Sequence, residues 1–155
     1  MTRLYGRSKK GKRCNDSAPD GRWERTTILS ALRKTGETHT LVFDGATDGK
    51  MFNAYVEKVL APVLTPGDIV VMDNLNVHKS ETAKKLIEGR KAECVFLPAY
   101  SPDLNPIEKM WSKIKAILRS LKARTREALQ EAIQFALTQV TAQDASGWFS
   151  ACGYI

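Results

Sequence analysis

Two short stretches decide the fold of this 155-residue chain: IVVMDN at residues 69–74 and PAYSPDLNPIE at residues 98–108. Residues 69–72 are an unbroken apolar run after the turn signal PGD, which predicts a strand buried on both faces. Asp73 ends that run. Ligands of open α/β folds bind at the carboxyl ends of parallel strands, so we expect the Asp73 carboxylate at such an edge.

The second stretch opens a helix. Asn105 suits the N-cap, Pro106 the first helical position and Glu108 the third. The 34 residues between Asp73 and Glu108 allow one helix, one strand and a loop back to the same edge. Taken alone, Glu108 could be a capping-box residue and Asp73 an Asx-turn residue. Their spacing favours a shared site, and these alternatives stay open.

Composition limits the class of protein. The length fits one domain, and 43% hydrophobic with 26% charged residues is ordinary for a soluble globular chain. No apolar run approaches the roughly 18 residues of a membrane span, and no signal-peptide core follows the N-terminus. We therefore expect a cytoplasmic protein. The three cysteines are far apart and have no ligand-like spacing, so they indicate neither a disulfide framework nor a zinc site.

The positive charge is concentrated near the N-terminus. Residues 1–34 hold ten Lys or Arg against three acids, whereas residues 35–155 hold 14 of each sign, so the formal +7 lies in the first segment. The run RSKKGKR at residues 7–13 can meet a polyanion, or it can be a solvated arm. The candidate DNA-binding residues in it are Lys9, Lys10, Lys12 and Arg13.

Hydrophobic periodicity and turn residues predict a mixed α/β fold. Residues 1–25 are polar and turn-rich, with 15–21 the least structured part, and we expect at most short strands there. The rest predicts one mixed sheet with helices packed against it. The expected strands are 26–32, 38–43, 69–72 and 94–97, and the expected helices are 51–60, 81–88, 106–121, one after Thr125 and one from Thr141 to about Gly153.

Two blocks of this sequence carry a resemblance to a known family. VVMDN with His78, followed by LPAYSPDLNPIE with Trp111, resembles the second and third blocks of the DDE transposases of mariner-type insertion sequences. The resemblance implies a ribonuclease-H-like sheet in strand order 3-2-1-4-5. It also implies three acidic residues that hold two Mg²⁺ ions, with Mn²⁺ as a substitute, and cut-and-paste transposition acting on transposon ends and target DNA.

Asp73 carries over as the second acid of that family and Glu108 as the third, as catalytic residues and metal ligands. Two metal ions roughly 4 Å apart can activate an attacking oxygen and stabilise the leaving one in a phosphodiester displacement. Mg²⁺ prefers carboxylate oxygens and keeps several waters, so a few acids are enough. Water would be the nucleophile of the first cut and a DNA 3′ hydroxyl that of the joining step.

The first acid of the family is missing here. It lies on the first, central strand, and residues resembling the segment after that strand begin at about Met1. We therefore expect residues 1–155 to be a partial catalytic domain without that strand and without the N-terminal DNA-binding domain. An upstream-encoded segment would supply the acid, and the chain alone should be inactive. The alternative is a non-catalytic nucleic-acid-binding remnant. Asp44 is expected to be a turn residue, because it would end a strand about 10 Å from the first one.

A basic stripe is predicted to lead away from Glu108. At about 100° per residue, six side chains fall near one line of an extended helix, either as a DNA-tracking surface or as an ordinary solvated face. They are Glu108, Ser112, Lys115, Arg119, Lys122 and Arg126.

We expect the remaining candidate residues to have structural roles. We expect His78 to be a hydrogen-bonding residue, and Trp111 and Trp148 to be packing residues. Without the central strand its neighbours would present open edges, so we also expect either association, for example as a homodimer, or poor folding.

Overall fold

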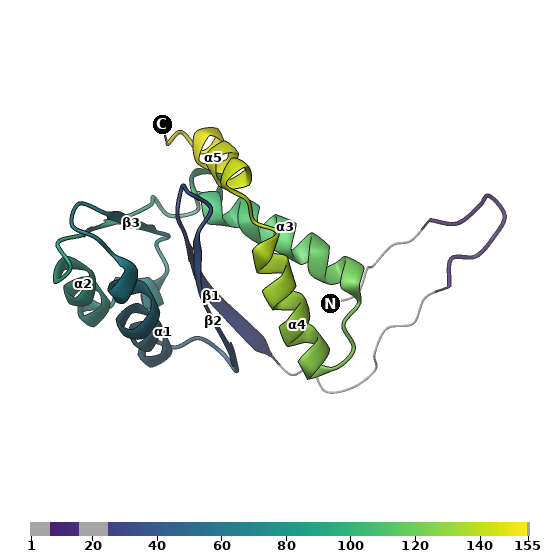
Figure 1. Cartoon of the computed structure of the whole chain (residues 1–155), viewed down its shortest axis with the longest axis horizontal. Coiled ribbons are helices and arrows are strands. Elements are labelled where there is room, and N and C mark those ends of the chain that lie inside the picture. Colours follow the sequence, from purple (N-terminus) through teal and green to yellow (C-terminus); the bar gives the residue numbers. More distant parts are fainter. Residues whose placement is uncertain (1–6, 16–24, 155) are drawn as a thin grey trace.

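The computed structural model describes residues 7–15 and 25–154, and Figure 1 shows their arrangement. The strands are β1 (Thr26–Leu32), β2 (Thr38–Asp44), β3 (Ile69–Met72) and β4 (Glu93–Phe96). The α-helices are α1 (Gly49–Tyr55), α2 (Glu81–Glu88), α3 (Pro106–Leu121), α4 (Arg126–Thr138) and α5 (Ala142–Ala151). Short helical turns are η1 (Val56–Leu60), η2 (Ala61–Val63), η3 (Asn76–Lys79) and η4 (Pro102–Leu104).

The β1–β2 hairpin separates two hydrophobic cores. Successive strand residues point to opposite faces. Ile28, Leu32 and Val42 therefore pack against the core of α3 and α4. Leu29 and Leu41 pack against the core of α1, η1 and α2. Figure 1 shows the hairpin standing between these two groups of helices.

The first core is built on one continuous helical run. Asp48 caps α1 through a 2.8 Å bond from the Met51 amide, and the run continues as a π-helical turn, η1, and then as η2. The predicted helix over residues 51–60 is thus confirmed, with a change of pitch in its second half. The buried side chains of this core include Phe52, Tyr55, Val56, Leu60, Ala83 and Ile87.

The second core joins the long helix α3 to α4. Trp111 and Trp148 pack against it, as the sequence predicts. A capping box between Thr141 and Asp144 begins α5, which is also a confirmed prediction. Lys113 on α3 donates to Asp144 at 2.5 Å and so ties α5 to α3. The buried side chains are Met110, Ile114, Leu118, Ala132, Ile133 and Ala136.

The predicted mixed sheet is split into two pairs of strands, and the open strand edges expected without a central strand are present among the described residues. β1 pairs with β2 in an antiparallel ladder, β3 pairs with β4 in a parallel ladder, and the described residues form no ladder between the two pairs. The expected burial of residues 69–72 and 94–97 is confirmed only for Met72 and Leu97. Ile69 is 61% exposed and Val95 is 38% exposed, because each strand has a neighbour on one side only.

Asp44 ends β2, the strand end at which the sequence analysis placed it, and its side chain forms an ion pair with Arg126. The expectations for the N-terminal segment fall partly on residues 1–6 and 16–24, which lie outside the described residues. Residues 7–15 contain a turn, closed by a 2.9 Å bond from the Lys12 amide to the Lys9 carbonyl, and the described part of this segment contains no strand.

Candidate active site

A cavity of about 590 Å³ lies between the two sheets. Consecutive residues of β1, consecutive residues of β3 and the first turn of α3 line it. Asp73 and Glu108 both line this cavity, although 34 residues separate them in the sequence. The fold therefore brings the two predicted acids to one space.

Asp73 follows β3 and is held by its own loop. The Leu75 amide donates to Asp73 Oδ1 at 3.3 Å, so the Asx turn is present. His78 Nδ1 lies 2.5 Å from the same oxygen, and the His78 ring packs against Phe52 in a tilted arrangement with centroids 4.7 Å apart. His78 is thus a hydrogen-bonding residue, as expected. The described residues make these bonds to Oδ1, and the side chain is 40% exposed, so lone pairs on Oδ2 are available to a ligand.

Glu108 lies exposed in the first turn of α3 and is not a capping-box residue. The Asn105 amide donates to the Pro102 carbonyl at 3.1 Å, and the Asn105 side chain makes no capping bond. Within the described part of the chain, no group donates a hydrogen bond to the Glu108 carboxylate. The positive end of the α3 dipole nevertheless favours a negative charge here. Both carboxylate oxygens of Glu108 are available.

These two acids fit part of a Mg²⁺ site. Carboxylate oxygens are the ligands that Mg²⁺ prefers, and it completes its shell with water or substrate. Across residues 7–15 and 25–154, no group of three or more His, Cys, Asp or Glu side chains is placed to hold a metal ion. Asp73 and Glu108 alone supply fewer acids than the three that the resemblance implies.

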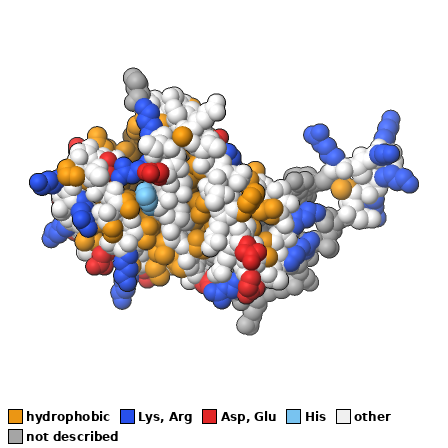
Figure 2. Space-filling view, in the orientation of Figure 1, with side chains coloured by type: hydrophobic (Ala, Val, Ile, Leu, Met, Phe, Trp, Pro, Cys, Tyr) orange, Lys and Arg blue, Asp and Glu red, His pale blue; other side chains and the backbone are white. Residues whose placement is uncertain are grey.

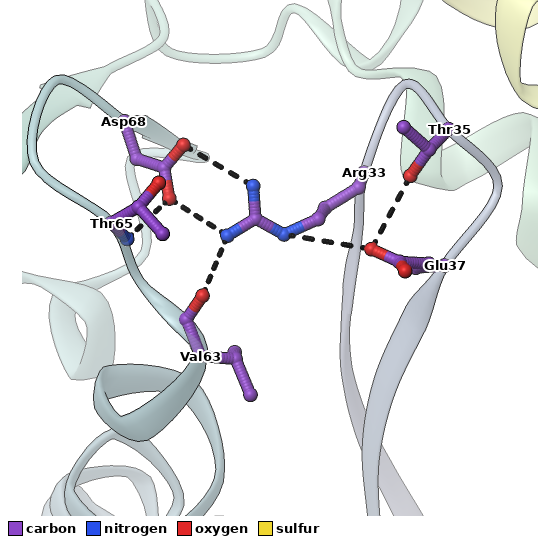
Figure 3. Close-up of polar contacts among 6 residues, drawn as sticks. All are labelled: Arg33, Thr35, Glu37, Val63, Thr65 and Asp68. Carbon is purple, nitrogen blue, oxygen red and sulfur yellow. Dashed lines mark hydrogen bonds and ion pairs between the residues drawn. The ribbon is translucent and has the colours of Figure 1, made fainter.

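The opposite end of the cavity is closed by an ion pair that sequence reasoning missed. Arg33 donates to the two oxygens of Asp68 at 3.2 and 2.7 Å and to the Val63 carbonyl at 2.8 Å, and the Thr65 amide donates to Asp68 at 2.8 Å (Figure 3). Bonding to Arg33 holds the pKa of Asp68 well below its usual range and raises the pKa of Arg33. The two residues are 35 positions apart, and no local pattern in the sequence links them.

His39 is a second cavity residue that the sequence did not point out. Its ring atom Nε2 is buried without a hydrogen-bond partner among the described residues. The Tyr55 hydroxyl donates to the His39 carbonyl at 2.9 Å, and burial raises the pKa of Tyr55 far above its usual value. An unpaired buried nitrogen is uncommon in folded proteins, so His39 is an exception among the residues that line the cavity.

The predicted basic stripe is wrong beyond Arg119. Lys115 and Arg119 are exposed on α3, but α3 ends at Leu121, and Lys122 adopts a left-handed conformation with φ of 50°. The chain direction changes there, so Lys122 does not continue the line. Arg126 begins α4 and is paired with Asp44.

The N-terminal basic residues lie on a separate segment. Residues 7–15 form a loop that projects from the body of the molecule, and Figure 2 shows basic side chains gathered on it. Every residue of this loop is exposed. The exposed basic residues on it include Lys9, Lys10, Lys12 and Arg13.

Comparison with known proteins identifies the family of the chain. No described helix is long and apolar enough to cross a membrane. A search of curated proteins finds no match to this sequence. The family model described as DDE superfamily endonuclease matches residues 1–130. That family acts on DNA and typically uses divalent metal ions, and the mixed α/β structure is consistent with its ribonuclease-H-like fold. The chain belongs to the DDE superfamily endonuclease family.

Proposed function

We propose that residues 1–155 belong to the catalytic domain of a mariner-type insertion-sequence transposase. With a complete set of acids, this domain cleaves DNA at transposon ends and joins them to target DNA. The observation that carries the proposal is the position of Asp73 and Glu108 on one cavity, each with carboxylate oxygens that no described residue uses.

Each residue of the site has a separate task. Asp73 and Glu108 bind Mg²⁺, or Mn²⁺ in its place, through their available oxygens. When bound, the two ions stabilise the attacking and leaving oxygens of a phosphodiester displacement. His78 is a positioning residue, because its bond to Oδ1 fixes the rotamer of Asp73 and leaves Oδ2 for the ligand. Packing of its ring on Phe52 limits the movement of His78 itself.

The third acid comes from an upstream-encoded segment in this proposal. Two things support it: the resemblance places the first acid on a strand before the matching segment, and the described residues contain no group of three metal-binding side chains. The second observation also favours the alternative, a nucleic-acid-binding protein that does no chemistry. Both readings predict that the 155-residue chain alone does not cleave DNA.

DNA contacts are proposed for two exposed basic surfaces. Lys115 and Arg119 lie on α3, the helix that begins beside Glu108, so phosphates bound there would lead toward the site. The loop at residues 7–15 adds a second set of cations that is independent of the fold. Contacts of this kind neutralise phosphates and carry no sequence specificity.

Metal binding by the two acids tests the proposal directly. Electron paramagnetic resonance of Mn²⁺ mixed with the chain should show bound ion, and D73N and E108Q should each reduce the bound fraction at least tenfold. The matched controls D103N and E131Q change exposed acids outside the cavity lining and should bind as wild type does. Equal Mn²⁺ binding by all five proteins would remove the metal site and leave the nucleic-acid-binding alternative.

A further inference from the structure

The loop that carries Asp73 is closed by its own hydrogen bonds. Seven residues, 74–80, join Asp73 to α2, and they include the turn η3. The His78 amide donates to the Leu75 carbonyl at 3.0 Å, and the Leu75 amide and the His78 ring both bond to Asp73 Oδ1. The position of the Asp73 carboxylate therefore depends on where η3 is held.

The end of η3 is tied to α1 through the Ser80 hydroxyl. Ser80 is the N-cap of α2, and its oxygen accepts a 3.4 Å bond from the Ala83 amide. The same hydroxyl donates its hydrogen to Asn53 Oδ1 on α1 at 2.7 Å. Because the hydrogen points to Asn53, a lone pair is left to face the Ala83 amide. Asn53 thus orients the hydroxyl that caps α2.

Two consecutive residues of α1 hold the loop in different ways. Phe52 is 4% exposed and packs against the His78 ring. A contact between tilted rings lets one ring slide on the other, whereas a hydrogen bond is directional. Asn53 and Phe52 also point about 100° apart around the helix, so they hold the loop from two directions. The bond from Ser80 to Asn53 supplies the directional part of this attachment.

The helix itself gives no reason for an asparagine at position 53. Asn is a poor helix former, because its side chain competes for backbone hydrogen bonds. Asn53 nevertheless lies inside α1, between the buried residues Phe52 and Tyr55. It does not line the cavity, so it cannot bind a ligand there. Its bond to Ser80 is the interaction that accounts for it.

We propose that Asn53 is a positioning residue for the metal-binding carboxylate of Asp73, acting through Ser80 and His78. The bond to Ser80 fixes the end of η3, and η3 fixes the His78 imidazole. The imidazole then holds Oδ1 of Asp73 and leaves Oδ2 for the ion. A carboxylate that is already oriented loses less freedom when the ion binds. The effect on metal affinity rests on the proposed function, whereas the effect on the His78–Asp73 bond does not.

Nitrogen chemical shifts of the imidazole rings test the effect on that bond. The chain has two histidines, so a long-range ¹H–¹⁵N spectrum of the full chain contains two rings, and His39 on β2 is the internal control. A carboxylate only accepts hydrogen bonds, so Nδ1 of His78 carries the hydrogen and one tautomer is favoured. The spectrum is recorded at about pH 8, where free imidazole is neutral.

Three variants separate the acceptor at position 53 from its shape. N53L removes the acceptor with little change of shape, so the two nitrogen signals of His78 should move toward each other as the tautomers exchange. N53D retains an acceptor oxygen and should restore the wild-type signals. The control T138V also replaces a helix side chain that makes a 2.7 Å hydrogen bond by an apolar one of similar shape, and should leave His78 unchanged.

Mn²⁺ binding tests the effect on the metal site. By electron paramagnetic resonance, N53L should bind Mn²⁺ about fivefold more weakly, less than the roughly 10–100-fold loss typical when a direct partner of a metal ligand is removed. N53D should recover the affinity, and T138V should bind as wild type does. If N53L does not fold, S80G removes the same bond from the other side, since glycine is tolerated at an N-cap.

The outcomes distinguish this inference from the proposed function. Absence of Mn²⁺ binding by wild type would contradict the proposed function, and the His78 signals would still show whether Asn53 holds the His78–Asp73 pair. Unchanged His78 signals in N53L and S80G, an equal change in T138V, or no restoration by N53D would overturn the role of Asn53. So would equal Mn²⁺ affinity of N53L and wild type.

Discussion

The two ends of the cavity differ in how their carboxylates are used. Both oxygens of Asp68 accept hydrogen bonds from the chain itself, from the Arg33 guanidinium and the Thr65 amide. At the other end, Asp73 uses Oδ1 within its own loop, and Glu108 accepts no hydrogen bond from the described residues. A carboxylate with its lone pairs filled by the chain supports the fold, whereas one with open lone pairs can bind a ligand. The hydrogen-bond partners of these acids, and not their residue type, distinguish the structural carboxylate from those that can bind a ligand.

The closed end should show the largest effect on stability. R33M removes a two-pronged donor and leaves Asp68 without its main partner, so we expect a loss of about 2 kcal/mol in the free energy of unfolding. Urea denaturation followed by circular dichroism measures it. The control K84M breaks an exposed pair at 3.8 Å and should cost less than about 0.5 kcal/mol. Equal losses in the two variants would contradict a structural role for the closed end.

Removal of cations near the open end of the cavity, where Asp73 and Glu108 lie, should lower the affinity for duplex DNA. No such effect is expected at the closed end. K115A/R119A removes two exposed cations from the helix that begins at Glu108, so affinity for duplex DNA should fall about fivefold. The slope of log affinity against log salt should become less steep by about two. Filter binding at several salt concentrations measures both. The double variant K84A/K85A on α2 is the matched control, and an equal loss there would show that total charge alone matters.

Acid pH should weaken the contact between α3 and α5. The resulting loss in the free energy of unfolding should be smaller than that caused by R33M. The Lys113 ammonium, with the Thr141 amide, lowers the pKa of Asp144 from 3.8 to about 2. This contribution is complete above pH 3.8 and is lost as pH falls through about 2. Wild type should therefore lose about 1 kcal/mol relative to D144N between pH 5 and pH 2, because the pair is partly exposed. Urea denaturation of both proteins at three pH values measures the difference, and parallel pH curves would contradict the assignment.

The smallest effect on stability is expected at Glu108. E108Q removes a charge that makes no hydrogen bond with the described residues, so the free energy of unfolding should change by less than about 0.5 kcal/mol. The same variant should lose Mn²⁺ binding, and this separation of stability from binding is what the comparison of the two ends predicts. A loss of stability as large as that of R33M would make Glu108 a structural residue.

Local signals in the sequence predicted most of the elements. The first turn of α3 and the capping box of α5 follow from Pro106 and from the Thr141–Asp144 pair, because these signals act within four residues. The apolar run at residues 69–72 correctly predicted a strand. It could not show that the strand has an open edge, because periodicity describes the faces of a strand and not its neighbours.

Contacts between distant residues were missed for a related reason. Arg126 pairs with Asp44 across 82 positions, so an apparent member of the basic stripe is partly neutralised by an acid that sequence spacing gives no reason to link with it. The end of α3 at Leu121 was predicted, but the change of chain direction after it was not. Lys122 adopts a left-handed conformation without being glycine, and the sequence at that point carries no stop signal.

The position of the β1–β2 hairpin between two cores restricts how the length of the chain can change. Ile28 and Leu29 are neighbours in sequence but belong to different cores. Deletion of one residue within β1 would rotate every following side chain to the wrong face, and both cores would lose their contacts together. The five residues that join the strands, 33–37, are the place where an insertion would leave this alternation intact.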